Sequence, residues 1–340
     1  MNILFDYQIK ENGSYGMKWY YDHLTKALRL LEGENNISEV GAESNKVNAI
    51  TRMSNDIAFR KALSGDVDIL HITGDNPRYL KKLKDMKNVR KVVTISSNLL
   101  KDGFTGSDVI HRGELVRECD GIIFTSEAVR DDFKSTYPGV DVPSVVIHAG
   151  YSDVAVKECD VPIPYILYVG SRERHDNFAL LMDAFALIHK QFPLFELICA
   201  GGPKFSDSET SRFKVMGYGD KITYVDPSEE ELIWLYQNAT CLICPALSND
   251  LGEQIIEGKH NGCAMVLSDT RSHQELAGDK AVFFDAAYDG DLAERIQDMI
   301  LDWEEHIEEP EGIRSWQDVA RETMEFYERL KKGNLIAFPS

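Results

Sequence analysis

The chain has 340 residues, of which 43% are hydrophobic and 27% are charged, and this composition is typical of a soluble globular protein with two domains. The net charge of −19 argues against a nucleic-acid-binding surface, because phosphate backbones are bound by clusters of Lys and Arg. The sequence contains no apolar run of about 18 residues and begins without a basic and apolar leader, so we expect a cytoplasmic protein without a membrane-spanning helix.

The first half of the chain alternates predicted strands with predicted helices, and this order favours a parallel, doubly wound α/β sheet. A strand at 2–7 leads into a loop with Gly13 and Gly16 and then into an amphipathic helix at 17–31. The later predicted elements are helices at 54–65, 78–87 and 128–137 and strands at 67–74, 89–97, 119–127 and 142–151.

A second α/β alternation follows a segment without periodicity. Residues 152–164 carry two prolines and no repeating apolar pattern, and we place an interdomain linker at 155–164. The expected domains are 1–154 and 165–314, followed by a long amphipathic helix at 315–332. The other predicted elements include strands at 165–170, 195–202 and 221–226 and helices at 177–192, 228–239 and 289–302.

The stretch from Cys241 to Asp285 predicts a buried strand, a polar loop, a helix and a second buried strand. Ligands of open parallel sheets bind at the carboxyl ends of the strands, where helix N-termini favour anions. Gly252 would keep the backbone open at the helix entry, and Glu257 falls about one turn further along. The pattern therefore predicts a site for a phosphate-bearing ligand.

Two short motifs have both a chemical and a structural interpretation. The CxxC pair Cys241 and Cys244 could bind a metal or undergo redox chemistry, but its apolar strand context favours buried free thiols, as for most of the six cysteines. Asp66 and Asp68 form a DxD, which in some enzymes holds a metal-bound diphosphate. Here the motif opens a predicted strand, and we favour a polar strand entry.

Several blocks resemble the retaining glycosyltransferases of family 4, which have the GT-B fold. They are YILYVGSRERHDNFALLMDAFALI, ELICAGG, the run from ITYVD to VFFD, RSWQDVARETMEFYERL, FDYQIKENGSYG and SEAVRDDF. The resemblance implies two Rossmann-like domains that face a cleft, with the helix 315–332 crossing back to the N-terminal domain. The C-terminal domain would bind a nucleotide-sugar and the N-terminal domain an acceptor, without a metal or another cofactor.

The same resemblance assigns roles around the predicted helix entry. Glu257 corresponds to the second glutamate of an E-x7-E motif, which takes the ribose hydroxyls of the donor, and a carboxylate can accept two O–H donors at once. Asn249 stands where the first glutamate would be, and an asparagine cannot stabilise positive charge near the anomeric carbon. Asp250 is adjacent and could substitute for that glutamate.

The family's basic pair, which neutralises the leaving diphosphate, aligns here with His175 and Asp176. Arg172 and Arg174 lie in the same loop and could replace it, although solvated loop arginines are an equal alternative. The residues expected at the donor site are Gly170, Arg172, Arg174, Val225, Asn249, Asp250, Gly252, Glu253 and Glu257.

On the acceptor side, the family's His-Asp pair is replaced by Ser96 and Ser97, and Met17 follows Gly16 where many relatives have a second glycine. His273 lies in the predicted loop TRSHQELAG and is either an acceptor contact or a surface histidine. The catalytic residues are not identified, since Asn249 and Ser96 occupy the family's polar active-site positions.

Two functions are consistent with these residues. The first is transfer of a hexose, with retention, from a UDP- or GDP-sugar to a saccharide or a lipid-linked saccharide. The second is a catalytically degenerate GT-B module that partners or chaperones an active glycosyltransferase, or that binds a saccharide. The basic stretch 78–91, with Lys81, Lys82, Lys84 and Lys87, could contact the anionic inner face of a membrane or could be a solvated helix.

Overall fold

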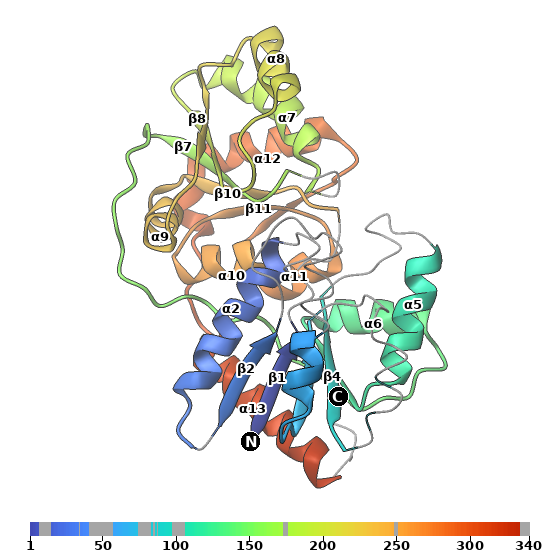
Figure 1. Cartoon of the computed structure of the whole chain (residues 1–340). Helices are drawn as coiled ribbons and strands as arrows, with labels where there is room; N and C mark the ends of the chain where they lie inside the picture. The colour runs from blue at the N-terminus through green and yellow to red at the C-terminus, as the bar shows by residue number, and fades with distance from the viewer. Residues whose placement is uncertain are drawn as a thin grey trace. The chain divides into compact units, whose positions relative to one another are not determined.

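The structure is a computed structural model, and it describes residues 1–6, 15–33, 35–40, 57–73, 83, 86, 88–96, 106–172, 176–247 and 251–333 (Figure 1). The chain divides into two units. Unit 1 comprises Met1–Gly150 and Arg314–Ser340, and unit 2 comprises Tyr151–Ile313. The chain therefore leaves unit 1 slightly before the expected end of the first domain, and the predicted linker 155–164 belongs to unit 2.

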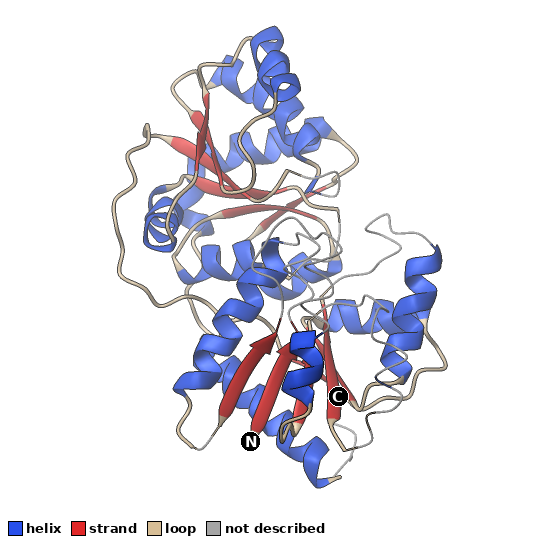
Figure 2. Cartoon of the chain, in the orientation of Figure 1, coloured by secondary structure: helices blue, strands red, loops and turns tan. Residues whose placement is uncertain are grey.

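Unit 1 contains a sheet of six parallel strands in the order β2-β1-β3-β4-β5-β6. Strands are drawn in red and helices in blue in Figure 2. Most of its strands coincide with apolar runs of the sequence. The exception is β2, which the sequence did not predict because its side chains are mostly exposed. The strands are β1 (Asn2–Asp6), β2 (Asn36–Val40), β3 (Ile69–Ile72), β4 (Arg90–Ile95), β5 (Gly121–Phe124) and β6 (Ser144–Val146).

Helices cover both faces of this sheet, in agreement with a doubly wound fold. The described helices with complete bounds are α2 (Tyr15–Leu30), α5 (Gly106–Arg117), α6 (Glu127–Thr136) and α13 (Trp316–Lys332). Helices α5 and α6 contribute to the core on one face. On the other face, α13 packs so closely that a Cβ at Gly121 would lie 2.6 Å from Leu330. The final helix thus belongs to unit 1, as the resemblance implied.

Unit 2 contains a second sheet of six parallel strands, in the order β12-β11-β10-β7-β8-β9. Its strands are β7 (Tyr165–Val169), β8 (Glu196–Ala200), β9 (Ile222–Val225), β10 (Cys241–Cys244), β11 (Met265–Ser268) and β12 (Val282–Phe284). Its helical elements are α7 (Phe178–Gln191), α8 (Asp207–Met216), α9 (Glu229–Asn238), α10 (Glu253–His260), α11 (Arg271–Ala277), α12 (Asp289–Asp302) and the short 3-10 helix η3 (Trp303–His306).

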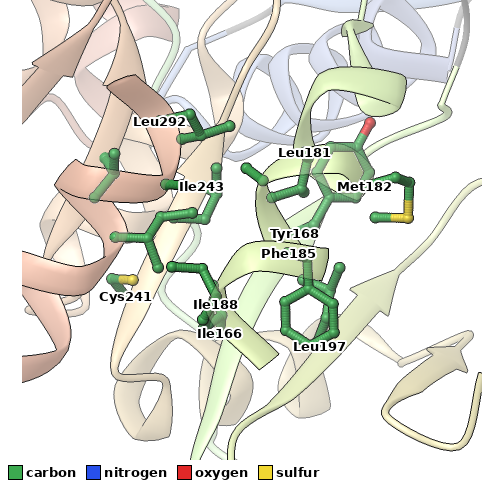
Figure 3. Close-up of a cluster of buried hydrophobic side chains, with 14 of the residues drawn as sticks. Ile166, Tyr168, Leu181, Met182, Phe185, Ile188, Leu197, Cys241, Ile243 and Leu292 are labelled. Atoms are coloured by element: carbon green, nitrogen blue, oxygen red, sulfur yellow. The ribbon is translucent and has the colours of Figure 1, made fainter. Parts of the chain in front are cut away.

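The core of unit 2 has two apolar layers, one on each side of this sheet. Alternate residues of β7, such as Ile166 and Tyr168, pack against Leu181 and Phe185 of α7 (Figure 3). The intervening residues of the strands pack with α9 and α10 on the opposite face. Burial of each large apolar side chain contributes about 1.5–3 kcal/mol, so both layers stabilise the sheet and fix its carboxyl edge.

Two helices of unit 2 were not predicted from the sequence. Helix α8 begins with a capping box formed by Ser206 and Glu209. Helix α11 occupies the segment that we expected to be a loop, and Thr270 caps its N-terminus by accepting a hydrogen bond from the His273 amide. Helix α9 also begins with a capping box, formed by Ser228 and Glu231.

The cysteines are free thiols, and all except the half-buried Cys159 are buried. Cys241 and Cys244 form the two ends of the buried strand β10, which confirms the interpretation of the CxxC as a structural pair. The carboxylate of Asp68 accepts the Asn2 amide at 2.8 Å and pairs with Lys331 at 2.7 Å, so this member of the DxD is held within unit 1.

The sequence led to two predictions about membranes: that the chain has no membrane-spanning helix, and that residues 78–91 could contact an anionic surface. No helix in the described ranges is both long enough and apolar enough to cross a membrane. The lysines proposed to contact an anionic surface, Lys81, Lys82, Lys84 and Lys87, lie outside the described residues. Membrane contact through 78–91 therefore stays a prediction.

Candidate functional site

The strand order of unit 2 reverses between β7 and β10. The chain passes from β7 to β8 and β9 on one side and then returns to β10 on the other. Ligands of open α/β sheets bind at such a switch point, beyond the carboxyl ends of the two strands. Gln254 of α10 spans this point, because its Nε2 donates to the carbonyl of Val169 at 3.4 Å. The sheet topology therefore places the candidate site next to the start of α10.

The loops after β7 and β8 approach each other closely beside the switch point. A Cβ at Gly202 would lie 2.6 Å from the carbonyl oxygen of Gly170, so only glycine fits there. Tyr224 donates to the Gly202 carbonyl at 2.9 Å, and the Gly201 amide donates to the Val225 carbonyl at 3.0 Å. These contacts fix the backbone around Gly170 and Val225, two of the predicted donor-site residues.

Helix α10 begins at Gly252 in a left-handed conformation, with φ +72°. A Cβ on this residue would lie 2.2 Å from Leu276, and left-handed backbone is unfavourable for other residues. Gly252 has no side chain with which to cap the helix, and the first amides of a helix have no intrahelical acceptor. The N-terminal turn, including Glu253, thus presents N–H groups and a positive dipole end at the switch point.

Glu257 lies one turn into α10 and is buried, with 5% of its surface exposed. Its Oε1 accepts a hydrogen bond from the Ser152 amide at 2.9 Å. The residue expected to bind ribose is therefore a buried carboxylate on α10 that accepts a main-chain N–H. The contact with Ser152 was not predicted, because the two residues are 105 positions apart and no local pattern signals the pairing.

The side chain of Arg172, one of the candidates for the diphosphate, has several partners within unit 2. Its side chain is buried and pairs with Glu209 at 3.1 Å. The guanidinium carbon lies 4.8 Å from the ring centroid of Phe205 and 5.7 Å from that of Tyr224. The guanidinium also donates to the carbonyls of Gly201 and Pro203.

These contacts show that Arg172 is not a solvated loop arginine, which was one of our two alternatives for this residue. The planar guanidinium satisfies several acceptors at once and stacks on aromatic faces, as arginine does in interior sites. Because Glu209 also closes the capping box of α8, Arg172 ties the loop after β7 to the start of α8. In this arrangement it positions the two loops.

The carboxylate of Asp176, which the resemblance aligned with the family's basic pair, accepts the Ser171 hydroxyl at 2.6 Å. The neighbouring candidates Arg174 and His175 lie outside the described residues, as do Asn249 and Asp250. Among the residues that the structure describes in the loop after β7, the one cationic side chain is therefore Arg172.

His273 is neither a loop residue nor a surface residue. It lies in α11 with 2% of its surface exposed, and its Nδ1 is 3.0 Å from both the hydroxyl and the carbonyl oxygens of Ser268. Its Nε2 is 3.8 Å from the sulfur of Cys244. Burial lowers the pKa of His273 to about 4, so the ring is neutral near pH 7.

The other predicted acceptor-side residues lie in unit 1. Gly16 and Met17 are half-buried in the first turn of α2, and Ser96 directly follows β4. Ser97 is outside the described residues. In the described part of the chain, no group of three or more His, Cys, Asp and Glu side chains has the geometry to hold a metal ion.

Comparison with known proteins identifies a glycosyltransferase region in this chain. Residues 157–311 match the family described as Glycosyl transferases group 1. A curated relative, the alpha-maltose-1-phosphate synthase of Mycolicibacterium smegmatis, is 26% identical over 268 residues, which cover 68% of each chain. The family match covers the whole sheet of unit 2 and the candidate site.

Solved structures resemble the chain over almost its full length. The sucrose-phosphate synthase of Thermosynechococcus elongatus superposes with a TM-score of 0.77 at 16% identity and covers 98% of this chain and 100% of its own. Anabaena Alr3699/HepE in complex with UDP and glucose superposes with a TM-score of 0.74 at 12% identity and covers 96% and 99%. The chain has the GT-B fold, and the match of residues 157–311 to Glycosyl transferases group 1 supports a glycosyltransferase.

Proposed function

We propose that the chain is a retaining hexosyltransferase of family 4, which moves a sugar from a UDP- or GDP-linked donor to a saccharide or a lipid-linked saccharide. The observation that carries the proposal is the buried carboxylate of Glu257, one turn beyond the open entry of α10. This carboxylate belongs to the helix that begins beside the switch point of a Rossmann-like sheet, in a region that matches Glycosyl transferases group 1.

Each part of a nucleotide-sugar has a partner of suitable chemistry in unit 2. Glu257 accepts ribose hydroxyls, because a carboxylate has acceptor sites on both oxygens. The first amides of α10, around Gly252 and Glu253, meet the diphosphate, which is stabilised by N–H donors and the helix dipole. Asn249, Asp250 and Arg174 complete the proposed donor site.

We further propose that the nucleotide-sugar is a co-substrate and that transfer needs no metal and no other cofactor. If so, excess EDTA leaves the rate of transfer unchanged, and a rate that returns only when Mg²⁺ or Mn²⁺ is added contradicts this part. UDP is the first nucleotide to test, because one of the similar structures contains UDP and glucose.

A thermal-shift panel with UDP, GDP, ADP and their glucose or mannose conjugates tests donor binding. A ligand that binds only the folded chain stabilises it by about 2.7 kcal/mol at one hundred times its Kd. We expect UDP or GDP to raise the Tm, and we expect Glu257→Ala to remove this shift. Glu294→Ala, which changes an exposed glutamate of α12, is the matched control and keeps it. The proposal is wrong if no nucleotide raises the Tm of the wild-type chain.

A second candidate is a non-catalytic GT-B subunit that partners an active glycosyltransferase or binds a saccharide. The burial of Arg172 favours it, because this arginine is committed to Glu209 and to aromatic rings, whereas Asp176 takes a position of the family's basic pair. This candidate predicts that Glu257→Ala has no effect on the activity of a complex with the partner. The two functions are therefore separated by the same variant.

A further inference from the structure

The chain enters unit 2 at Tyr151, and its first two residues there contact one face of α10. The Ser152 amide donates to Oε1 of Glu257 at 2.9 Å. The ring of Tyr151 stacks on that of His260, with the centroids 3.5 Å apart and the planes 14° from parallel. Because residues three apart in a helix lie on the same face, the two contacts are neighbours on α10.

The hydrogen bond from the Ser152 amide restricts the orientation of the Glu257 carboxylate, because both residues are buried. Ser152 and Glu257 are each 5% exposed. A buried carboxylate is costly unless donors satisfy it, and a hydrogen bond to a charged group is stronger than one between neutral groups. A main-chain N–H is a well-fixed donor, since it cannot change rotamer. The Ser152 amide therefore limits the rotation of the Glu257 side chain.

The adjoining part of α10 is fixed by the sheet. A Cβ at Gly258 would lie 3.1 Å from the side chain of Leu242 on β10, and Ile255 is fully buried in the same apolar layer. The helix backbone thus cannot move toward the sheet without repacking. The position of the Glu257 carboxylate is then set by this packing on one side and by residues 151–152 on the other.

We propose that the segment Tyr151–Ser152 is a positioning element for the ribose of the donor. Its N–H holds Oε1 of Glu257, so that the carboxylate meets the ribose hydroxyls in one orientation. The stacked ring of Tyr151 on His260 keeps the segment against the helix. This inference rests on the proposed function, since it assigns a task to the residue that would bind the donor.

The main test compares a variant that lacks the Ser152 N–H with a variant that keeps it. Ser152→Pro has no amide hydrogen, whereas Ser152→Ala changes only the side chain. Tyr151 forms a strand bridge, and extended backbone is the conformation that a residue before proline prefers. Titration calorimetry with UDP and GDP should give an affinity about tenfold weaker for Ser152→Pro and nearly unchanged for Ser152→Ala.

A second pair of variants tests the segment without altering the amide. Tyr151→Phe keeps the stacked ring and should bind like the wild type, whereas Tyr151→Ala should bind several-fold more weakly. Amide hydrogen exchange supplies a readout that does not depend on a nucleotide. The Ser152 amide should exchange slowly in the wild-type chain and faster in Glu257→Ala, while the amides of β10 are unchanged.

The outcomes separate this inference from the proposed function. If the wild-type chain binds neither UDP nor GDP, both fall. If the wild-type chain binds one of them and a folded Ser152→Pro variant binds it equally well, the positioning role is wrong and the proposed function stands. If Ser152→Pro does not fold, equal affinities of Tyr151→Ala and Tyr151→Phe overturn the inference in the same way.

Discussion

The buried His71 of β3 predicts an acid-sensitive attachment of α13 in unit 1. Its Nδ1 hydrogen-bonds to the hydroxyl of Tyr327 on α13, and its Nε2 is 2.9 Å from the hydroxyl of Thr94. The imidazole ring stacks on Phe5 at 4.9 Å. Burial lowers the pKa of His71 to about 3, because the charged form would lose its hydration.

The sign of the pH effect follows from the two pKa values. In the unfolded chain the pKa of a histidine is about 6.5, so between about pH 6.5 and pH 3 the unfolded state binds more protons than the folded state. The contribution of neutral His71 to the free energy of unfolding is fully present above pH 6.5 and is lost as the pH falls toward 3. At pH 5.0, about 1.5 units below the unfolded pKa, the loss is about 2 kcal/mol.

The assay compares wild type with His71→Asn, which does not titrate in this range. Amide exchange in residues 316–332 is measured at pH 7.5 and 5.0 after correction for intrinsic rates, because His273 titrates in unit 2 and would affect a whole-chain readout. The wild type should lose about 2 kcal/mol of protection in α13, and the variant, already less stable at pH 7.5, should lose much less. Equal losses in the two proteins would refute the reasoning.

Three further substitutions probe the candidate site. Glu257→Gln keeps an oxygen for the Ser152 amide but presents an NH2 group to ribose, so UDP or GDP affinity in calorimetry should fall by about 2 kcal/mol, or about thirtyfold; an unchanged Kd contradicts the ribose role. Arg172→Lys keeps the charge but loses the planar stacking group, and the urea midpoint should fall by an amount equivalent to about 1–2 kcal/mol. An unaltered midpoint would remove the loop-tying role. Gly252→Ala forces a side chain into left-handed backbone, at a cost of about 1 kcal/mol or more, and both the Tm and nucleotide affinity should decrease; a variant that matches the wild type in both would show that the open entry is unnecessary.

The parts of the fold that the sequence predicted are those with strong local patterns. Buried strands such as β7 and β10 are continuous apolar runs, and long helices such as α7 and α13 have apolar positions at helical spacing. Strand β2 was missed because most of its side chains face solvent and leave no apolar pattern.

Helix α11 shows why a short helix is difficult to predict from the sequence. It has seven residues, and its local sequence resembles a polar loop, so only its burial against the sheet reveals the helix. For that reason His273 was expected on the surface, whereas the packing places it inside.

The candidate site was predictable where a residue's role depends on its own element. Gly252 and Glu257 could be placed from the strand–loop–helix pattern and from the family resemblance. The role of Arg172 could not, because it depends on Glu209 and Phe205, which lie on other segments of the chain. The same holds for Ser152, whose partner is distant in sequence. Such contacts exist only once the fold has brought the segments together.

The most direct test of the central claim is release of a nucleoside diphosphate from a nucleotide-sugar by the full chain. UDP-glucose, UDP-N-acetylglucosamine and GDP-mannose are each incubated with the protein and a set of saccharide acceptors, and the release of UDP or GDP is followed together with a new glycosidic product. We expect acceptor-dependent release with one donor, and we expect Glu257→Gln to slow this release strongly. Tight nucleotide binding without release from any donor, in wild type and variant alike, would contradict sugar transfer and leave the non-catalytic GT-B subunit as the function.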